Sequence, residues 1–252
     1  MGIERLHTFS YDGRRLSDFG AVIAQRPTQV VSVRSVDFSD TPFVSGDELL
    51  DNGRYENIEL SIKIRAVPAF CFKSFTTFCY ELTEWLNTGS GYKIYRDTYN
   101  PNYYRLGIVT NISDIVAVYR DVYETTITIN CKPFLYSDAG LKTQTFSTTE
   151  DNLEIALKNP EKWDSEPIFK ITGAGRYNLI AGNVVMGVIV DDPLTIDKTK
   201  ENVYNDLGEP CNNRITGLKI PYLQAGNNEI VVNRLSGTGK FSVEVTPNWR
   251  RL

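Results

Sequence analysis

The sequence predicts a mainly β protein, with one amphipathic helix in its first half and a β-sandwich in its second. Three observations support this: an alternating segment near residue 60, a helical repeat of aromatic residues after it, and many short apolar runs between turn residues in the second half. With 252 residues, of which 41% are hydrophobic, the chain can form two ordinary domains, each with its own core.

The most strongly patterned segment is 51–67. Apolar and polar residues alternate from Ile58 to Ala66, which is the period of a half-buried strand. Gly, Asp and Asn residues upstream predict a polar loop from Thr41 to Gly53, and Pro68 is expected to end the strand.

An amphipathic helix of about four turns is expected next. Its apolar residues recur at helical spacing: Phe72, Phe75, Cys79, Leu82 and Leu86, with Phe78 and Trp85 beside them. Glycines in the stretch Asn87 to Gly91 are expected to end the helix. The aromatic stripe needs a partner, so we expect it to pack on the apolar side of the preceding strand.

Further strands are expected in the first half at Leu6 to Tyr11, Phe19 to Ala24, Val30 to Phe38, Tyr92 to Tyr95 and Arg105 to Ile112. The first two are expected to pair as a hairpin around the polar Arg14-Arg15 turn. The alternating run Val116 to Lys132 is long for one strand, so it requires a bulge or a strand shared between sheets.

A shift in composition near Tyr136 to Gly140 predicts a domain boundary, which gives domains 1–137 and 138–252. The stretch Ser137 to Thr149 is rich in Ser, Thr and Gly. Beyond it the expected strands are 168–172, 177–181, 184–190, 193–196, 215–220, 229–232 and 240–246. Short strands with turn residues between them are typical of a β-sandwich.

Charge and hydropathy argue against several classes of function. The formal net charge is −4, and a cut after Ser137 leaves −2 on each side, so no specific nucleic-acid binding is expected. The sequence shows neither the pattern of a cleaved secretion signal nor an apolar run long enough to span a membrane. We therefore expect a soluble protein that is not exported by a cleaved signal.

The four cysteines are expected to be free thiols in a reducing cytoplasm. Cys71 and Cys79 would lie about 12 Å apart along the helix, which is too far for a disulfide. The single histidine, His7, leaves no basis for a zinc site or for a Ser or Cys catalytic triad.

Two carboxylate pairs, Asp191-Asp192 and Asp47-Glu48, leave a glycosidase open, since that chemistry needs only two acids across a cleft. Both pairs stand in predicted turns, where acids are common for backbone reasons, and that interpretation is favoured. The stretch 197–206 lacks the spacing of a calcium loop, and Gly173-Ala174-Gly175 lacks the third glycine of a dinucleotide fingerprint. No catalytic, cofactor-binding or metal-binding residue is predicted, and no ligand-binding residue is assigned.

The stretch Val44 to Ile58 resembles the N-terminal signature of the distal tail proteins of long, flexible-tailed bacteriophages and prophages. In that family a glycine turn and a leucine pair precede an Arg-aromatic-Glu-Asn-Ile strand. Further segments resemble the family in the same order: Glu84 to Tyr92, Arg96 to Leu106, Asn130 to Phe134, Asn159 to Ile168, Gly173 to Gly175, Gly226 to Ile230 and Pro247 to Arg250.

This resemblance implies an N-terminal β-sandwich with a helix, which forms a six-subunit ring, and a C-terminal galectin-like β-sandwich. The ring would connect the tail tube protein to the tail-associated, fibre-bearing hub protein and to receptor-binding or baseplate proteins. The protein would lie at the virion tail tip after assembly in the host cytoplasm. No enzymatic activity and no cofactor are implied.

The alternative is a cell-wall carbohydrate-binding module or adhesin, in which Trp163 and Trp249 could stack on sugars. Galectin sugar sites depend on a histidine, and residues 138–252 contain none. We therefore interpret both tryptophans as packing residues.

Overall fold

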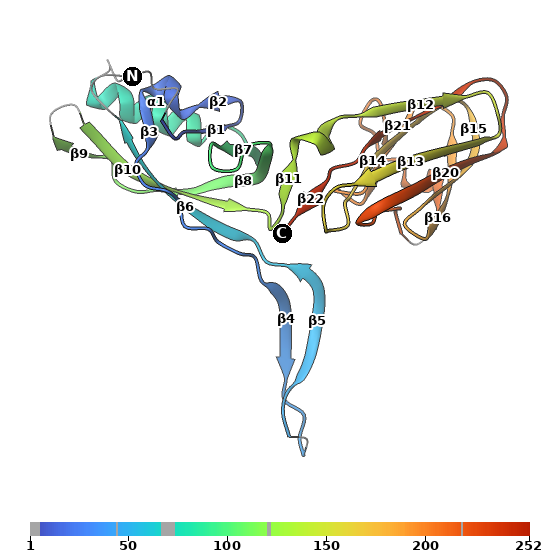
Figure 1. Cartoon of the computed structure of the whole chain (residues 1–252), viewed down its shortest axis with the longest axis horizontal. Coiled ribbons are helices and arrows are strands. Elements are labelled where there is room, and N and C mark those ends of the chain that lie inside the picture. Colours follow the sequence, from blue (N-terminus) through green and yellow to red (C-terminus); the bar gives the residue numbers. More distant parts are fainter. Residues whose placement is uncertain (1–5, 44, 67–73, 120–121, 218) are drawn as a thin grey trace. The chain divides into compact units, whose positions relative to one another are not determined.

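The computed structural model describes residues 6–43, 45–66, 74–119, 122–217 and 219–252 (Figure 1). The chain divides into two compact units, Met1–Leu135 with Leu252, and Tyr136–Arg251. Each unit has its own cluster of buried apolar residues. Strands predominate in both, as the sequence predicts, and the single described α-helix belongs to the first unit.

The described strands of the first unit form one antiparallel sheet and a separate two-stranded ribbon. In order, the sheet runs β2-β1-β7-β8-β10-β6-β3, with β9 beside β10. Its strands are β1 (Phe9–Tyr11), β2 (Arg14–Arg15), β3 (Ala21–Ile23), β6 (Ile58–Ala66), β7 (Lys93–Asp97), β8 (Tyr103–Ile112), β9 (Val116–Tyr119) and β10 (Val122–Cys131). The ribbon consists of β4 (Arg34–Ser39) and β5 (Glu48–Tyr55).

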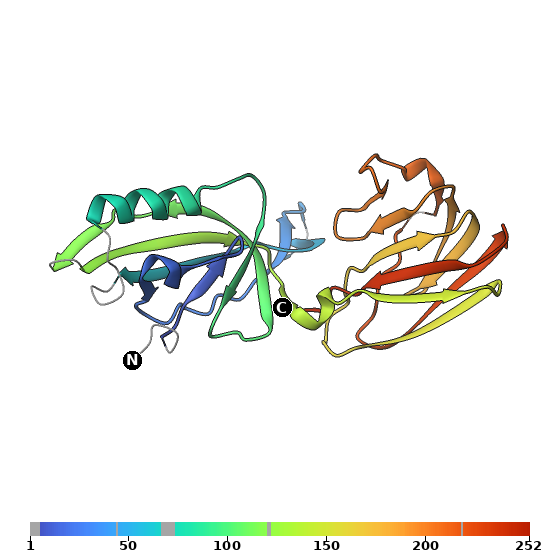
Figure 2. The same cartoon turned by 90° about the horizontal axis from the view of Figure 1, so that it is seen from above.

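The alternating segment forms β6, and its apolar residues are buried while the polar ones are exposed. Strand β6 pairs with β10 over nine residues, from Ala66 opposite Tyr123 to Ile58 opposite Cys131, and with β3 on its other side. Figure 2 shows α1 (Phe75–Leu86) lying across one face of this sheet. As predicted, the helix shares a core with the apolar side of β6.

The helix buries a different stripe from the expected one. Phe78, Leu82, Trp85 and Leu86 are buried, whereas Phe75 is exposed and Cys79 only half-buried. The indole of Trp85 determines this rotation, because it stacks on Phe19 at 4.7 Å and donates a hydrogen bond to the Tyr11 carbonyl oxygen at 2.9 Å. Phe72 and Pro68 lie outside the described residues.

Two other predictions in this unit are wrong. The first hairpin joins β1 to β2, while residues 16–19 form a 3-10 helix and β3 pairs with β6 instead. Strand β5 occupies much of the expected loop 41–53.

The long run after Ile115 contains the expected irregularity, since the register of β10 shifts against both β8 and β9. It is also divided into two antiparallel strands, β9 and β10.

The sheet of the first unit ends in β3 on one side and in the two-residue β2 on the other, and β9 adds a further edge beside β10. The backbone N–H of Ile23 in β3 donates to the carbonyl oxygen of His7 at 2.9 Å, so the outer side of β3 is in use. Strand β9 pairs only with β10 among the described strands, and all four of its residues are exposed.

The second unit contains two five-stranded antiparallel sheets, ordered β12-β21-β14-β17-β18 and β13-β20-β15-β16-β19. The first sheet consists of β12 (Gln144–Thr148), β14 (Ile168–Thr172), β17 (Leu194–Asp197), β18 (Asn202–Asn205) and β21 (Phe241–Thr246). The second consists of β13 (Asn152–Asn159), β15 (Gly175–Ala181), β16 (Val184–Val190), β19 (Ile215–Thr216) and β20 (Gly226–Ser236). Side chains from both sheets contribute to one buried cluster.

The expected strands of the second half are present, although 215–220 is reduced to two residues in β19. Four strands of this half were missed: β12, β13, β18 and the short β22 (Arg250–Arg251). The Ser- and Thr-rich stretch 137–149 is ordered rather than a plain linker, since β11 (Leu135–Ser137) pairs with β22. The Ser137 N–H donates to the Trp249 carbonyl oxygen at 2.8 Å.

A three-residue ion cluster lies on the polar side of β6 and β10. Glu124 accepts a bond from Lys63 Nζ at 2.9 Å and from Arg65 Nε at 2.6 Å, and its side chain is only 13% exposed. Hydrogen bonds from Lys63 and Arg65 lower the pKa of the Glu124 carboxyl.

We expect Glu124→Gln to reduce the dependence of the free energy of unfolding on pH in the acid range. A native pKa below the unfolded value of about 4.3 means that the carboxylate stabilises the fold above that pH. This contribution is lost as the pH falls through the lower native pKa. In denaturant unfolding, the free energy of unfolding of Glu124→Gln should be lower than that of wild type at neutral pH. In acid the two values should be closer to each other. Glu59→Gln, at an exposed position of β6, is the control, and parallel profiles for wild type and Glu124→Gln would contradict the expectation.

We expect Cys131 to resist thiol reagents in the native protein. Its side chain is buried and burial raises its pKa to about 12, so only about one thiol in ten thousand is ionised near pH 8. Cys79 is half-buried and should react first, although burial also raises its pKa. Peptide mass spectrometry after timed alkylation checks this order, and labelling of Cys131 at the same rate as Cys79 would contradict it.

Candidate assembly interface

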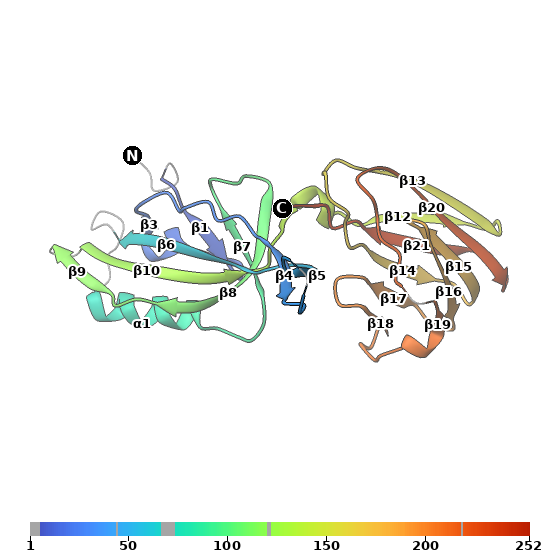
Figure 3. The same ribbon diagram turned by 90° about the horizontal axis from the view of Figure 1, so that it is seen from below.

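The most distinctive surface of the first unit is the ribbon of β4 and β5. We call it, with its connecting residues, the arm (34–55). Figure 1 shows the arm extending beyond the sheet of its own unit, and Figure 3 shows it nearly end-on. Strand β5 leads through Glu56 and Asn57 directly into β6, so the arm continues from the strand next to the outer strand β3.

One face of the arm carries an exposed apolar pair. Phe38 stands opposite Leu49 in the register of β4 and β5, and directly opposed residues of antiparallel strands point to the same face. Phe38 is 67% exposed and Leu49 59% exposed. A two-stranded ribbon is marginally stable alone in water, so an uncovered apolar pair on it indicates a surface that another molecule covers.

The other face carries a polar network beside an exposed leucine. The amide nitrogen of Asn52 donates to Ser35 Oγ at 3.3 Å and to Asp37 Oδ2 at 2.9 Å. Leu50, opposite Asp37, is 61% exposed on this face.

An ion pair near the base links the two strands on the same side as Phe38 and Leu49. Arg34 binds Asp51 at 2.6 Å, and the hydrogen bond from Arg34 lowers the pKa of the Asp51 carboxyl. These contacts hold the two strands in register.

A second candidate surface is the open edge at β9. Val116, Val118 and Tyr119 are 52%, 58% and 71% exposed. An unpaired apolar edge is a template for pairing with another chain, and natural proteins usually protect such edges with charge, proline or cover. The arm and the β9 edge are therefore the two candidate contact surfaces of the first unit.

The carboxylate pairs do not have the environment of a catalytic acid. Asp192 forms an ion pair with Arg214, whose hydrogen bond lowers the pKa of the Asp192 carboxyl, and Asp191 lies 4.0 Å from the same guanidinium. A general acid needs the opposite shift. Asp47 and Glu48 are exposed at the tip of the arm.

The other residues considered as candidates, His7 and the two tryptophans, make packing contacts or hydrogen bonds within the fold. His7 stacks on Tyr99 at 4.2 Å, and its Nδ1 lies 3.1 Å from Thr98 Oγ1. Trp249 is buried, as its assignment as a packing residue predicts, and Trp163 is half-buried.

Within the described ranges no group of three metal-ligating side chains could hold an ion. In the stretch 197–206, Asp197 is buried and accepts bonds from the backbone N–H and the hydroxyl of Thr199, so its carboxylate supports the local turn. No described helix has the length and apolar character to cross a bilayer.

Solved structures match nearly the whole chain. The crystal structure of the SPP1 Dit (gp 19.1) protein, presented as a paradigm of hub adsorption apparatus in Gram-positive infecting phages, aligns with a TM-score of 0.67 and 15% identity over 98% of this chain and 100% of that chain. This chain has the fold of a phage Dit protein. The family resemblance in the sequence is thereby confirmed at the level of the fold.

Two structures of the phage p2 baseplate in its activated conformation, with Sr and with Ca, align with a TM-score of 0.47 and 8% identity over 95% of this chain and 98% of theirs. No protein-family model and no curated protein matches the sequence.

The sequence predicts a strand over Val30 to Phe38, which overlaps β4, but a loop over much of β5, because Gly46, Gly53 and the nearby acids are turn residues. A usable signal was present: Leu49 and Leu50 are large apolar residues in a polar stretch, which is unusual for a plain loop. The β9 edge was not predicted because no glycine or proline in the sequence 116–132 divides the alternating run.

We expect the double substitution Phe38→Asp with Leu49→Asp to weaken self-assembly of the purified protein by about tenfold or more, since desolvated apolar contacts dominate interfaces. Its melting temperature should change little, because both side chains are exposed. Light scattering over a concentration series measures the first effect and thermal unfolding the second.

Leu207→Asp with Leu235→Asp is the matched control, since these leucines of the second unit are 83% and 63% exposed. Assembly of the arm variant at wild-type concentrations would contradict an interface role for the arm.

Proposed function

We propose that this protein is a structural hub of a phage tail tip. The observation that carries the proposal is the full-length match to the fold of the SPP1 Dit protein, which is a hub adsorption apparatus component by description. The exposed apolar face of the arm and the open β9 edge support it, because a hub protein must offer surfaces to other subunits.

In this proposal the first unit forms a six-subunit ring that continues the tail tube. The second unit, with its two sheets around one core, is a galectin-like β-sandwich that carries no sugar site. The ring connects the tube protein to the tail-associated, fibre-bearing hub protein and to the receptor-binding or baseplate proteins. A ring needs a heterologous contact in which two different surfaces of each copy meet, and the arm and the β9 edge are two such surfaces.

The proposal includes no enzymatic reaction and no cofactor. The hydrogen bond from Arg214 lowers the pKa of Asp192, which argues against a catalytic acid in the pair Asp191-Asp192. The alternative of a carbohydrate-binding module gains no support from Trp249, whose ring is buried and unavailable for stacking on a sugar.

We expect purified protein to form rings with sixfold symmetry. Negative-stain microscopy should show them, and light scattering should give a mass six times that of the 28.5 kDa chain. If the protein alone forms no ring, rings should appear when the tube protein or the tail-associated hub protein of the same phage is added as a template. A particle of one-chain mass at high concentration, alone and with both proteins present, would rule the proposal out.

A further inference from the structure

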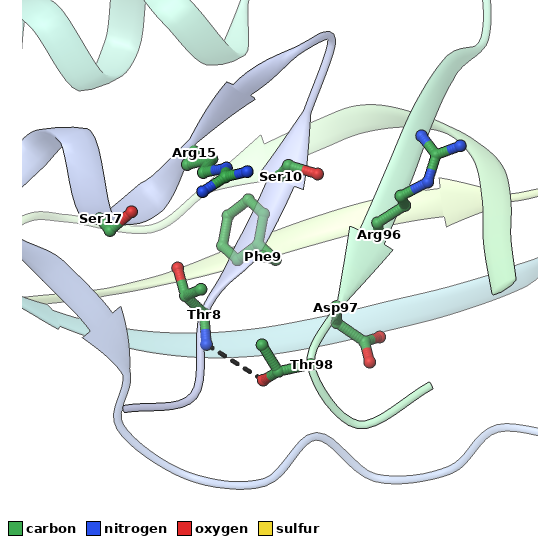
Figure 4. A pocket seen from close by; sticks show the side chains of 8 residues that line it. All are labelled: Thr8, Phe9, Ser10, Arg15, Ser17, Arg96, Asp97 and Thr98. Carbon is green, nitrogen blue, oxygen red and sulfur yellow. Dashed lines mark hydrogen bonds between the residues drawn. The ribbon is translucent and has the colours of Figure 1, made fainter. Parts of the chain in front are cut away.

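The pocket beside β1 and β7 contains charged groups of both signs (Figure 4). Its volume is about 510 Å³, and Arg15, Arg96 and Asp97 are among the residues that line it. The guanidinium of Arg96 lies 5.1 Å from the centre of the Tyr104 ring, and Asp18 accepts a bond from the backbone N–H of Arg15 at 3.0 Å. Because acids and arginines lie together there, the pocket selects no ligand by charge.

The arm, in contrast, contains a chemically reactive pair, Asn52-Gly53. It is the only Asn-Gly sequence in the chain. The backbone nitrogen that follows an asparagine can attack its side-chain carbonyl carbon, and glycine hinders this ring closure least because it has no side chain. Both residues are exposed. Apart from its chain neighbours, nothing in the described chain lies within 4 Å of the position that a Cβ of Gly53 would take.

The ladder between β4 and β5 is interrupted at this pair. The register passes from Arg34 opposite Tyr55 to Val36 opposite Asp51, so Ser35 alone faces the three residues 52–54. The backbone N–H of Gly53 donates to Asp51 Oδ1 at 2.9 Å. The nitrogen that would attack is therefore held by a neighbouring side chain of β5 and not by the partner strand.

The Asn52 side chain links the two strands at the interruption. Its Nδ2 atom donates to Ser35 Oγ at 3.3 Å and to Asp37 Oδ2 at 2.9 Å. Among the described residues no cation pairs with Asp37, so the amide of Asn52 is important for this carboxylate. These bonds slow the attack while the arm is closed. A two-stranded ribbon is only marginally stable alone, so it opens locally and then leaves the pair free to react.

We propose that Asn52-Gly53 is a site of spontaneous deamidation that irreversibly loosens the arm. The Gly53 nitrogen bonds to Asn52 Cγ, the Cγ–Nδ2 bond breaks, and ammonia leaves with the proton of the Gly53 N–H. Water then opens the resulting succinimide at one of its two carbonyl carbons, which gives aspartate or isoaspartate at position 52. One water is consumed and one ammonia is released. The inference goes beyond the proposed function and does not rest on it, because it concerns the arm of a single copy.

The product cannot restore the closed arm. A carboxylate at position 52 has no N–H to donate to Asp37, and it places two negative charges where the hydrogen bond was. Ser35 can adapt, because its hydroxyl can donate instead of accepting, but the carboxylate of Asp37 can only accept. Isoaspartate also adds a methylene group to the main chain of β5, which shifts the register of this strand. A modified arm therefore stays looser than an unmodified one.

Peptide mapping of the full chain tests the site. The tryptic peptide 35–54 contains no other asparagine, so a gain of about one mass unit in it reports Asn52 alone. We expect this gain in mildly alkaline buffer before any other asparagine of the folded protein converts. In the chain unfolded by urea the gain should be faster, because the bonds of the arm are absent. Retention of the Asn52 amide while other asparagines convert, or equal rates in the folded and unfolded chain, would overturn the proposal.

Hydrogen exchange of the arm tests the consequence. Asn52→Asp should raise the exchange rate of the arm amides by about tenfold, since a hydrogen bond to a charged group is lost, and should leave β6 and β10 as in wild type. Asn227→Asp, at an exposed position of the second unit, changes the net charge equally and is the control.

An exchanged pair is the sharper test of the same contact. Combining Asp37→Asn with Asn52→Asp moves the amide donor to the other strand, so the slow exchange of the arm should return. Arm exchange in Asn52→Asp at the wild-type rate, or a combined variant without recovery, would overturn the role of the Asn52 amide.

Discussion

The pairing of β6 with β10 is the constraint on which the first unit depends. Nine opposed residue pairs fix its register, and the buried side of β6 carries the core that α1 covers. A slip of one residue would turn every apolar side chain of β6 to the solvent. Because β5 leads directly into β6, the same register also fixes where the arm leaves the sheet. The pairing of β6 with β10 thus fixes both the packing of the core and the position of the arm.

Charge and apolar area are distributed in a way that suits assembly rather than catalysis. The arm carries −3 of the formal net charge and an exposed Phe38–Leu49 pair, and the sheet carries the exposed strand β9. In the carboxylate pair Asp191-Asp192, Asp192 is ion-paired with Arg214. The hub proposal supposes that the surfaces left exposed in one copy are covered by another subunit.

The sequence was informative where periodicity and burial agree. Strand β6 alternates cleanly because one face meets the core, and the helix after it was found for the same reason. The rotation of α1 was not predictable, since it depends on where the Trp85 indole finds a hydrogen-bond acceptor, the Tyr11 carbonyl, far away in the sequence.

Elements outside the cores were harder to predict. The second strand of the arm was predicted as a loop because its apolar residues face solvent and give no burial pattern, and its Asp and Gly residues are those of turns. Strand β12 was not predicted because its burial pattern is weak. Ser10, Arg15 and Arg96 become neighbours only through the strand order β2-β1-β7, which the sequence does not show.

The hydrogen bond between Ile23 and His7 has a consequence for solubility. A second copy could pair with the open β9 edge of the first. The β3 edge of each copy is already occupied, so no further copy can pair there. Edge-to-edge ladders of the kind that lead to fibrils need two such edges on every molecule. The occupied β3 edge therefore blocks one route to unlimited polymerisation along the sheet, and β2, the other outer strand, is only two residues long.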